Sequence, residues 1–277
     1  MPPTPCPSTC NVLLIGNGGR EHALAWRLRR SPRLGELWLA SGSAGGGGAN
    51  AGLEALGRAC PEPMDLKNTF RMQRWCDRND IHLVVVGPEA PLAAGITDAL
   101  SSDTRLVFGP TREGARLEAD KAFAKQLMRQ AAVPTADARV FTDPSAATRF
   151  VTAREEPCVV KASGLCAGKG VVVCDTTEEA LEAIDRLMVR AEFGDAGRTV
   201  VIEERMSGPE VSVLALVDGR NIWTMDPCQD HKRVGENDTG PNTGGMGAYC
   251  PTPVIDAATL ARVEREILVP TIDSLRR

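Results

Sequence analysis

The sequence predicts an α/β protein in two parts: a doubly wound parallel-sheet domain, followed by a domain with a mixed, largely antiparallel sheet. Short apolar strands alternate with helices up to about residue 110, which is typical of a parallel sheet covered by helices. Beyond about residue 112, strands follow one another with one helix between them. The chain has 277 residues, which suits about two domains of ~100–200 residues. We therefore expect a disordered lead-in at 1–10 and domains at 11–111 and 112–277.

The elements of the first domain follow from its apolar runs and its glycines. Apolar runs predict strands at Asn11–Ile15, Leu37–Ala40, Ile81–Val86 and Arg105–Pro110. Helices are expected from about Glu21, over Thr69–Asn79 and after the turn at Gly87–Pro88, and the glycine-rich residues 41–48 are expected to form a loop. The chain thus passes repeatedly from strand to helix, as a doubly wound sheet requires.

In the second domain, apolar and β-branched runs predict a series of strands. They lie at Val159–Lys161, Val171–Val173, Thr199–Glu204, Val211–Val217 and Asn221–Thr224. Glu178–Ala191 has the pattern of a helix, and residues 258–277 also favour a helix. Asp218–Gly219 is a hairpin turn signal, so the last two strands should pair in antiparallel fashion.

Composition excludes several classes of protein. Apolar residues make up 43% of the chain and charged residues 25%, as in ordinary soluble proteins. The net charge of −4 argues against a nucleic-acid or anionic-membrane binder, and no apolar run approaches the ~18–20 residues of a membrane span. No secretory signal is visible, and the nine cysteines lack CxxC pairs, so the reducing cytoplasm is the expected compartment. Cys228 and His231 have the spacing of a pair of metal ligands, but the sequence has no second such pair to complete four ligands, so we expect no zinc site.

The segment Gly16–Glu21 ("GNGGRE") follows a strand and opens a helix, as a dinucleotide-binding turn does. It departs from that fingerprint at Glu21, where a third glycine is needed, and at Ala40–Ser41, where an acidic residue should hold a ribose. We therefore expect no nicotinamide or flavin cofactor. Two readings remain: backbone amides hold a phosphate monoester with the help of Arg20, or the glycines serve turn geometry alone.

A second glycine-rich segment, Lys161–Val173 ("KASGLCAGKGVVV"), lies between two predicted strands. Gly170 and a strand follow Lys169, so this is not a Walker loop, which leads into a helix. The glycines allow the backbone N–H groups to cover phosphates as a flap, and Lys161 can reach phosphate oxygens. The alternative is a plain glycine-rich hairpin.

Two further segments are candidates for function. Glu203–Glu204 end a strand and Glu210 follows a turn, so these carboxylates either accept hydrogen bonds from adenine or ribose or are a solvated strand end. Residues 228–251 ("CQDHKRVGENDTGPNTGGMGAYCP") form an irregular run without predicted secondary structure. So long a loop is usually functional, and disorder is the alternative.

Together these segments closely resemble the phosphoribosylamine–glycine ligase family of the ATP-grasp superfamily. The resemblance covers residues 11 to 277 and rests on "GNGGREHALAW", "VVVGPEAPLAAGI", "FGPT", "KASGLCAGKGVVV", "VIEERMSGPEVS", "FGDAG" and "QDHKRVGENDTGPNTGGMGAY". The last of these is specific to this family, whereas the lysine–glycine loop is shared more widely. The resemblance implies an ATP-grasp second domain, in which a glycine-rich hairpin closes over the phosphates of ATP.

The resemblance also implies roles for individual residues. ATP is expected at Lys121, Lys161, Gly164, Gly168, Lys169, Gly170, Glu203, Glu204 and Glu210. Phosphoribosylamine is expected at Gly16, Asn17, Gly18, Gly19, Arg20, Glu21, Gly87, Pro88 and Glu89. The reaction centre with glycine is expected at Asp230, His231, Lys232, Arg233, Pro241, Asn242, Thr243, Gly244, Gly245, Met246 and Gly247. The catalytic set is expected to be Lys161, Asp230, Lys232 and Arg233.

The implied reaction is the ATP-dependent joining of glycine to 5-phosphoribosylamine through glycyl phosphate, in de novo purine biosynthesis. Mg²⁺ or Mn²⁺ is expected in the full-length enzyme, but the family's metal ligands would lie beyond Arg277, so we expect the 277-residue chain alone to be inactive. Alternatives are a non-catalytic nucleotide-binding fragment or another ATP-grasp ligase. Asp120 stands where the family usually has serine, and Cys166 stands where it commonly has alanine.

Overall fold

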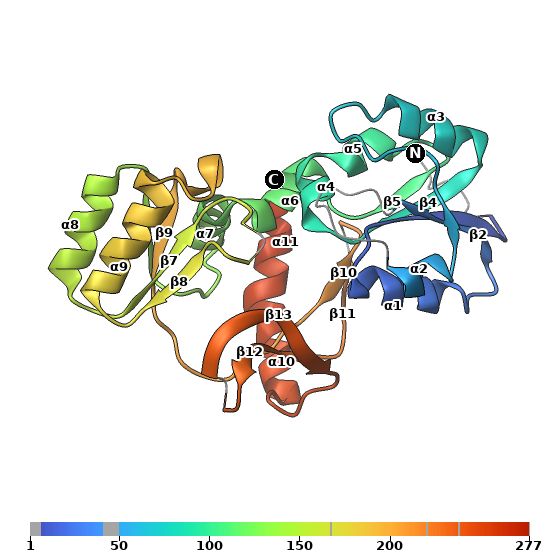
Figure 1. Cartoon of the computed structure of the whole chain (residues 1–277). Coiled ribbons are helices and arrows are strands. Elements are labelled where there is room, and N and C mark those ends of the chain that lie inside the picture. Colours follow the sequence, from blue (N-terminus) through green and yellow to red (C-terminus); the bar gives the residue numbers. More distant parts are fainter. Residues whose placement is uncertain (1–6, 41–49, 167, 220, 238, 277) are drawn as a thin grey trace. The chain divides into compact units, whose positions relative to one another are not determined.

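The structure is a computed structural model that describes residues 7–40, 50–166, 168–219, 221–237 and 239–276 (Figure 1). Of the expected lead-in at 1–10, residues 1–6 lie outside the described residues, as do the glycine-rich residues 41–48, and Cys10 already belongs to the first strand. The chain divides into two compact units, Met1–Asp120 and Lys121–Arg277. The expected boundary between 111 and 112 falls at the start of helix α6 (Arg112–Ala119), which packs against helix α4 (Glu89–Ala93) of the first unit. The first unit therefore extends to the end of α6.

The first unit contains a parallel sheet with the strand order β3-β2-β1-β4-β5, as predicted. Its strands are β1 (Cys10–Ile15), β2 (Leu34–Ala40), β3 (Arg58–Ala59), β4 (Ile81–Val86) and β5 (Leu106–Phe108). The chain runs from β1 outward through β2 to β3, and then returns to place β4 on the other side of β1. The winding thus reverses between β1 and β4, and in such sheets ligands bind beyond the carboxyl ends of the strands at that point.

Helices cover both faces of this sheet. They are α1 (Gly19–Leu28), α2 (Ala51–Glu54), α3 (Phe70–Arg78), α4, α5 (Ile96–Leu100) and α6. Leu13 joins a buried cluster with residues of α3 and α5, whereas Leu14 joins a cluster with residues of α1 and α2. Both side chains are fully buried because successive strand residues point to opposite faces. The single helix expected after Gly87–Pro88 is two helices, because Gly95 adopts φ +88° between α4 and α5.

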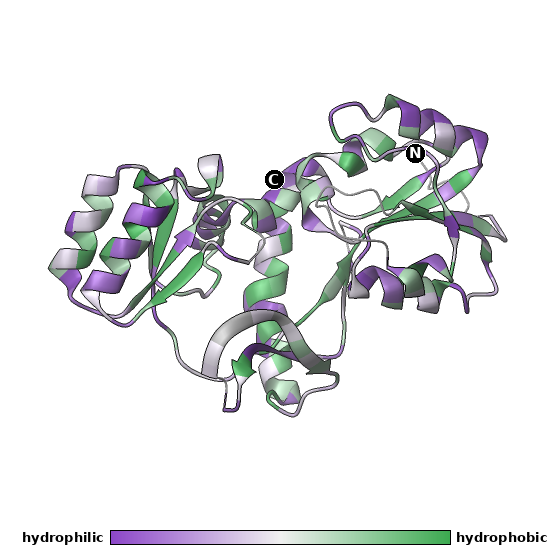
Figure 2. Cartoon of the chain, in the orientation of Figure 1, coloured by the Kyte–Doolittle hydropathy of each residue, from purple (hydrophilic) through white to green (hydrophobic). Residues whose placement is uncertain are grey.

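The second unit contains an antiparallel sheet with the strand order β6-β9-β7-β8, which confirms the predicted change of pattern. Its elements are α7 (Lys121–Gln130), β6 (Ala138–Phe141), α8 (Pro144–Arg154), β7 (Cys158–Ala162), β8 (Val171–Cys174), α9 (Thr177–Ile184), η1 (Asp185–Val189), η2 (Gly194–Gly197) and β9 (Val200–Glu204). Helices α8 and α9 lie on one face, where they bury the apolar strand residues that Figure 2 colours green.

Two hairpins follow in the chain. Strands β10 (Ala215–Val217) and β11 (Ile222–Thr224) pair in antiparallel fashion, as predicted, although β10 is shorter than the expected Val211–Val217. Strands β12 (Gln229–Gly235) and β13 (Thr239–Tyr249) also pair. The prediction that 228–251 is irregular was therefore wrong. Glycine and polar residues are uncommon in strands, so the composition of this segment did not predict them. The pairing also shifts register within β12, so apolar and polar residues do not alternate regularly along it.

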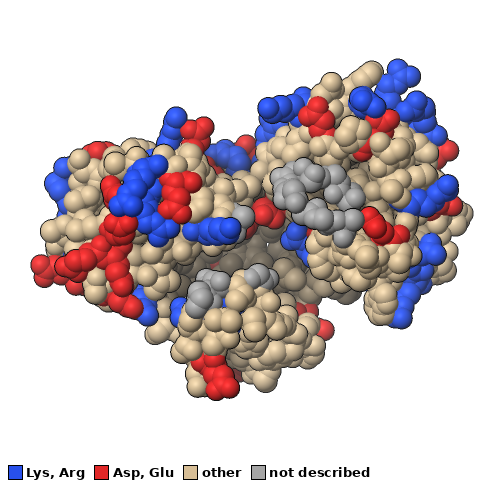
Figure 3. Space-filling view, in the orientation of Figure 1, with Lys and Arg blue, Asp and Glu red and all other residues tan. Residues whose placement is uncertain are grey.

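The last helical segment agrees with the expectation for residues 258–277. It consists of α10 (Ala257–Val263), η3 (Glu264–Leu268) and α11 (Val269–Leu275). Among the helices of the described residues, none is both long and apolar enough to serve as a membrane span. On the face shown in Figure 3, acidic and basic side chains are interspersed over each unit, in keeping with the small net charge of −4.

Burial on both faces of the parallel sheet can be tested with two adjacent leucines. Leu13→Ala and Leu14→Ala should each lower the free energy of unfolding by about 2–5 kcal/mol, because each removes a fully buried side chain. Leu106→Ala is the control: its side chain is 59% exposed, so the change should stay within about 0.5 kcal/mol. Urea unfolding followed by tryptophan fluorescence measures all three, since Trp38 and Trp75 pack in this unit. A lower free energy of unfolding for only one of the two buried-leucine variants would contradict burial on both faces of the sheet.

Candidate functional site

At the carboxyl ends of β1 and β4, the buried carboxylate of Glu21 holds the first glycine-rich turn together. The side chain of Glu21 is 3% exposed. Its Oε2 accepts a hydrogen bond from the backbone N–H of Gly18 (2.6 Å), and its Oε1 accepts one from Nε of Arg20 (2.8 Å). Glu21 is the third residue of α1 and Gly18 is its N-cap, so the carboxylate binds the N-cap N–H as the third residue of a capping box does, although Gly18 has no side chain to return the bond. A buried carboxylate needs such donors.

The glycines on either side are explained by the same carboxylate. A Cβ atom on Gly16 would lie 2.7 Å from Cδ of Glu21, and one on Gly87 would overlap with its Oε1. Gly16 also has φ +123°, which side chains disfavour. The turns after β1 and β4 therefore meet at Glu21, which stands where a dinucleotide-binding turn has its third glycine.

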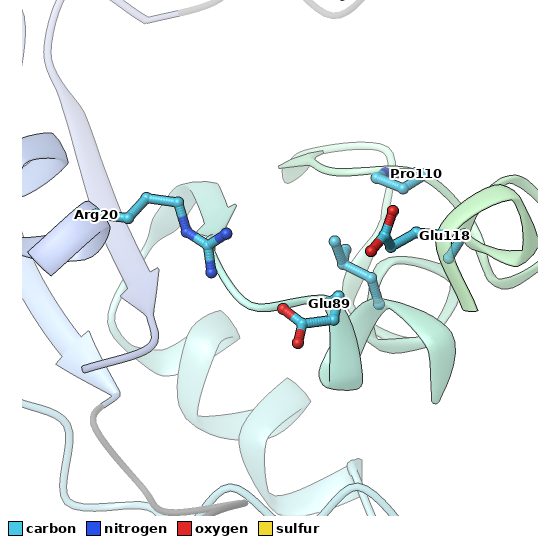
Figure 4. A pocket seen from close by; sticks show the side chains of 7 residues that line it. Arg20, Glu89, Pro110 and Glu118 are labelled. Atoms are coloured by element: carbon cyan, nitrogen blue, oxygen red, sulfur yellow. The ribbon is translucent and has the colours of Figure 1, made fainter. Parts of the chain in front are cut away.

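A pocket of about 250 Å³ opens beside this turn, within the first unit (Figure 4). It is lined by Arg20, Gly87, Glu89, Leu92, Pro110, Ala115 and Glu118. The side chain of Arg20 is 58% exposed and points towards the side that Glu89 and Glu118 line. The pocket thus offers a cation on one side and carboxylates on the other.

Three of the residues singled out from the sequence for this region, Arg20, Gly87 and Glu89, line the pocket. Asn17 instead accepts a hydrogen bond from the backbone of Asn50 through its side chain (3.1 Å). The sequence reasoning missed the contribution of α6. Pro110 lay in the "FGPT" motif, but no local signal marks Glu118, because its place depends on α6 packing back against α4.

In the second unit, the side chain of Glu203 lies between two lysines. Its Oε2 is 2.8 Å from Nζ of Lys161, and its Oε1 is 3.4 Å from Nζ of Lys125. The Glu203 side chain is 8% exposed, that of Lys125 is 9% exposed and that of Lys161 is 27% exposed. The sequence reasoning missed Lys125, although it lies four residues after Lys121 on α7 and so on the same helix face.

The glycine-rich loop between β7 and β8 lies beside the start of α7. Nζ of Lys121 donates to the carbonyl oxygen of Gly164 (3.5 Å). The Lys121 backbone N–H donates to the carbonyl oxygen of Ser163 (2.9 Å), so α7 begins on this loop. Gly168 has φ +77°, and the N–H of Lys169 donates back to Cys166 (2.9 Å), which turns the chain towards β8. The loop thus joins the antiparallel strands β7 and β8, as both interpretations of this segment expected, and its residue 167 lies outside the described residues.

A Cβ atom at two of the loop glycines would meet neighbouring atoms. At Gly164 it would lie 2.7 Å from Cα of Ala196, and at Gly170 it would lie 2.6 Å from Sγ of Cys166. The loop backbone therefore packs closely on its surroundings at both ends. Packing within the unit therefore accounts for these two glycines.

The other carboxylates expected around the nucleotide have distinct partners. Oε1 of Glu204 accepts a hydrogen bond from the N–H of Asp137 (2.9 Å), which ties β9 to the residue before β6. Glu210 lies 3.3 Å from Nζ of Lys232, and Asp230 lies 3.4 Å from it. Burial works to lower the pKa of Lys232, but the nearby charges of Glu210 and Asp230 outweigh it, so the pKa is raised. Lys232 thus keeps its positive charge.

The β12–β13 hairpin carries the remaining candidates. His231 stacks on Tyr249, with ring centroids 5.8 Å apart. Arg233 pairs in register with Asn242, although the side chains of Pro241, Asn242 and residue 244 lie outside the described residues. The hydroxyl group of Thr243 donates to the carbonyl oxygen of Lys232 (2.8 Å) and accepts from the N–H of Gly245 (3.0 Å).

The end of β13 is open to solvent. Met246 is 58% exposed, and Gly247 has φ +154°. The hairpin therefore gathers His231, Lys232, Arg233 and Asp230 on one short strand facing a glycine-rich partner. Within the described residues, no cluster of three or more His, Cys, Asp or Glu side chains forms a metal site.

Comparison with known proteins gives consistent matches. Residues 10–118 match the N domain of phosphoribosylglycinamide synthetase, and residues 119–277 match its ATP-grasp (A) domain. A phosphoribosylamine–glycine ligase of Rhodopirellula baltica is 50% identical over 98% of this chain and 61% of its own length. The trifunctional purine biosynthetic protein adenosine-3 of Gallus gallus is 46% identical over 96% of this chain and 26% of its own length.

A solved structure agrees with these matches. The phosphoribosylamine–glycine ligase of Thermotoga maritima is similar with a TM-score of 0.75 and 29% identity, over 95% of this chain and 61% of that protein. The chain thus spans less than two thirds of the ligases that it resembles.

The packing of glycines around Glu21 can be tested by adding a methyl group. Gly87→Ala should lower the free energy of unfolding by about 1–3 kcal/mol, because the new Cβ displaces a buried, hydrogen-bonded carboxylate. Gly19→Ala is the matched control: its Cβ would meet nothing within 4 Å at the start of α1, so stability should be unchanged or higher by up to about 1 kcal/mol. Equal losses for both variants in urea unfolding would show that Glu21 does not organise the turn.

Proposed function

The chain belongs to the phosphoribosylglycinamide synthetase family, and on this basis we propose that its protein joins glycine to 5-phosphoribosylamine with ATP, giving glycinamide ribonucleotide, ADP and phosphate. This is a ligase reaction of purine biosynthesis. The observation that carries the proposal is the match of the two units, in order, to the two domains of that synthetase. The proposed substrates meet chemistry that suits them in each unit.

ATP is proposed to bind at the β7–β8 loop. Its phosphates carry negative charge, and the ammonium groups of Lys121 and Lys161 lie at this loop. The backbone N–H groups of Gly168 and Gly170 are proposed to complete a cover for phosphate oxygens, whereas those of Gly164 and Lys169 already donate to the carbonyl oxygens of Ala196 and Cys166. On the nucleoside side, Glu204 and the β9 backbone are proposed to face adenine, and Glu210 the ribose. A loop that closes over the phosphates also keeps water away from a reactive acyl phosphate.

Phosphoribosylamine is proposed to bind in the pocket at the carboxyl ends of β1 and β4. Arg20 and the backbone N–H groups at the start of α1 suit its phosphate, since a helix N-terminus attracts anions. Glu89 and Glu118 on the other side suit its hydroxyl and amino groups. Glu21 has a supporting role in this proposal, because both of its oxygens already bind donors of the turn.

Glycine and the bond-making steps are proposed to lie at the β12–β13 hairpin. A glycine carboxylate oxygen attacks the γ-phosphorus of ATP, and the bond from that phosphorus to ADP breaks. The amine nitrogen of phosphoribosylamine then attacks the acyl carbon, gives up a proton, and phosphate leaves. Lys161, Lys232 and Arg233 are proposed to balance the charge on the transferred phosphoryl group, and Asp230 to hold Lys232 in place.

The described residues do not provide a set of carboxylates for Mg²⁺ or Mn²⁺, so no step here is derived through a metal ion. The proposed compartment is the cytoplasm. The cysteines that the structure describes are thiols rather than disulfides, which suits a reducing environment.

The proposed reaction makes ADP release depend on two substrates. In the natural full-length protein that contains these residues, we expect ADP release only when both glycine and phosphoribosylamine are present, because the amine must consume the acyl phosphate. A coupled assay for ADP, with each substrate left out in turn, measures this. ADP release that does not depend on phosphoribosylamine would refute the proposed function.

The proposed phosphate contact of Lys161 predicts a loss of ATP affinity. Lys161→Ala should remove a charge-assisted hydrogen bond worth about 1.5–3 kcal/mol, so ATP binding or turnover should fall about tenfold or more. Lys67→Ala, which removes an exposed lysine from the other unit, is the control and should behave like the wild type. Titration calorimetry with ATP gives the affinities, and an unchanged affinity for Lys161→Ala would place the phosphates elsewhere.

A further inference from the structure

Lys125 is a buried cation beside the proposed ATP site. Its Nζ donates to the hydroxyl group of Thr135 (2.7 Å) and to the carbonyl oxygen of Ala136 (3.0 Å), and lies 3.4 Å from Oε1 of Glu203. It is 9% exposed and comes from the middle of α7, whereas Lys161 comes from β7 and is 27% exposed. Of the two lysines on Glu203, Lys161 is therefore the one that solvent or a ligand can reach.

The charges of Lys125, Lys161 and Glu203 determine which of the two lysines can leave the carboxylate. Two ammonium groups share one buried carboxylate, so the cluster has one positive charge in excess. If Lys161 were the only partner of Glu203, its move to an anionic ligand would leave a buried, unpaired carboxylate, which is strongly unfavourable. With Lys125 in place, Glu203 keeps one cation, itself held by Thr135 and Ala136, whether or not Lys161 stays.

We propose that Lys125 is a positioning residue that keeps Glu203 neutralised, so that Lys161 can leave the carboxylate and pair with a nucleotide phosphate. The identity of that anion as ATP rests on the function proposed above. Glu203 then holds Lys161 until the nucleotide binds and does not accept a hydrogen bond from adenine, because both of its oxygens are engaged by lysines. In the absence of Lys125, Lys161 stays bound to Glu203, so its positive charge is not available to the ligand.

A purely structural role for Lys125 makes a different prediction. In that case the lysine matters because it ties α7 to residues 135 and 136, and the charge of Glu203 is irrelevant. Glu203→Gln separates the two roles, since it keeps the shape of the side chain but removes the charge that needs neutralising.

The test measures ATP binding by titration calorimetry in the natural full-length protein. Lys125→Met should weaken ATP binding about tenfold or more in the wild-type background, because Lys161 is then held by Glu203. In the Glu203→Gln background, the same change should alter the affinity by less than about threefold. Thr135→Val, which removes one internal partner of Lys125 but not its charge, is the matched control and should bind ATP like the wild type.

Folding of the variants is a second measure of the coupling between Lys125 and Glu203. If Lys125→Met alone fails to fold, the double variant with Glu203→Gln should fold, because no buried carboxylate then remains to be neutralised and Lys161, which is 27% exposed, can be solvated. Wild-type ATP affinity in Lys125→Met, or an equal loss in both backgrounds, would overturn the proposal. ATP binding that follows the expected pattern in a protein without ligase activity would refute the proposed function and leave the role of Lys125 in place.

Discussion

Each unit depends on satisfying one buried carboxylate. Ionised carboxylates are costly to bury unless donors or cations surround them. In the first unit, Glu21 meets this requirement with a backbone N–H group and Arg20. In the second unit, Glu203 meets it with Lys125 and Lys161. The residues nearest to each proposed ligand site are thus positioned by a group that the ligand need not touch.

The two solutions differ in what they allow to move. The Glu21 carboxylate is enclosed by Gly16 and Gly87 and caps α1, so the turn that it holds is preorganised. Glu203 instead binds two side-chain cations, of which Lys161 is the more exposed and the one that we propose to leave. A rigid turn suits a phosphate monoester held throughout a reaction, whereas a lysine that can leave its carboxylate suits a nucleotide whose charge changes as phosphate is transferred.

The sequence predicted what periodicity and local turn chemistry control. The apolar runs of β1 and β4 predicted a buried parallel sheet, and Asp218–Gly219 predicted a hairpin. The prediction from sequence failed where pairing between distant parts of the chain determines the structure. β12–β13 looked irregular because its glycines and polar residues form strands only against each other. Glu118 carried no local signal, and Lys125 carried only its i, i+4 spacing from Lys121, because the roles of both arise from the packing of α6 and α7. Motif resemblance located the loops but not their supporting residues.

The most direct test of this account is an experimental structure of the protein with a non-hydrolysable ATP analogue. The account predicts that Nζ of Lys161 lies within hydrogen-bond distance, about 2.7–3.2 Å, of a phosphate oxygen. It also predicts that Glu203 retains Lys125 as its partner and that the β7–β8 loop covers the phosphates. A nucleotide bound away from this loop, or one bound there while Lys161 remains paired with Glu203, would contradict it.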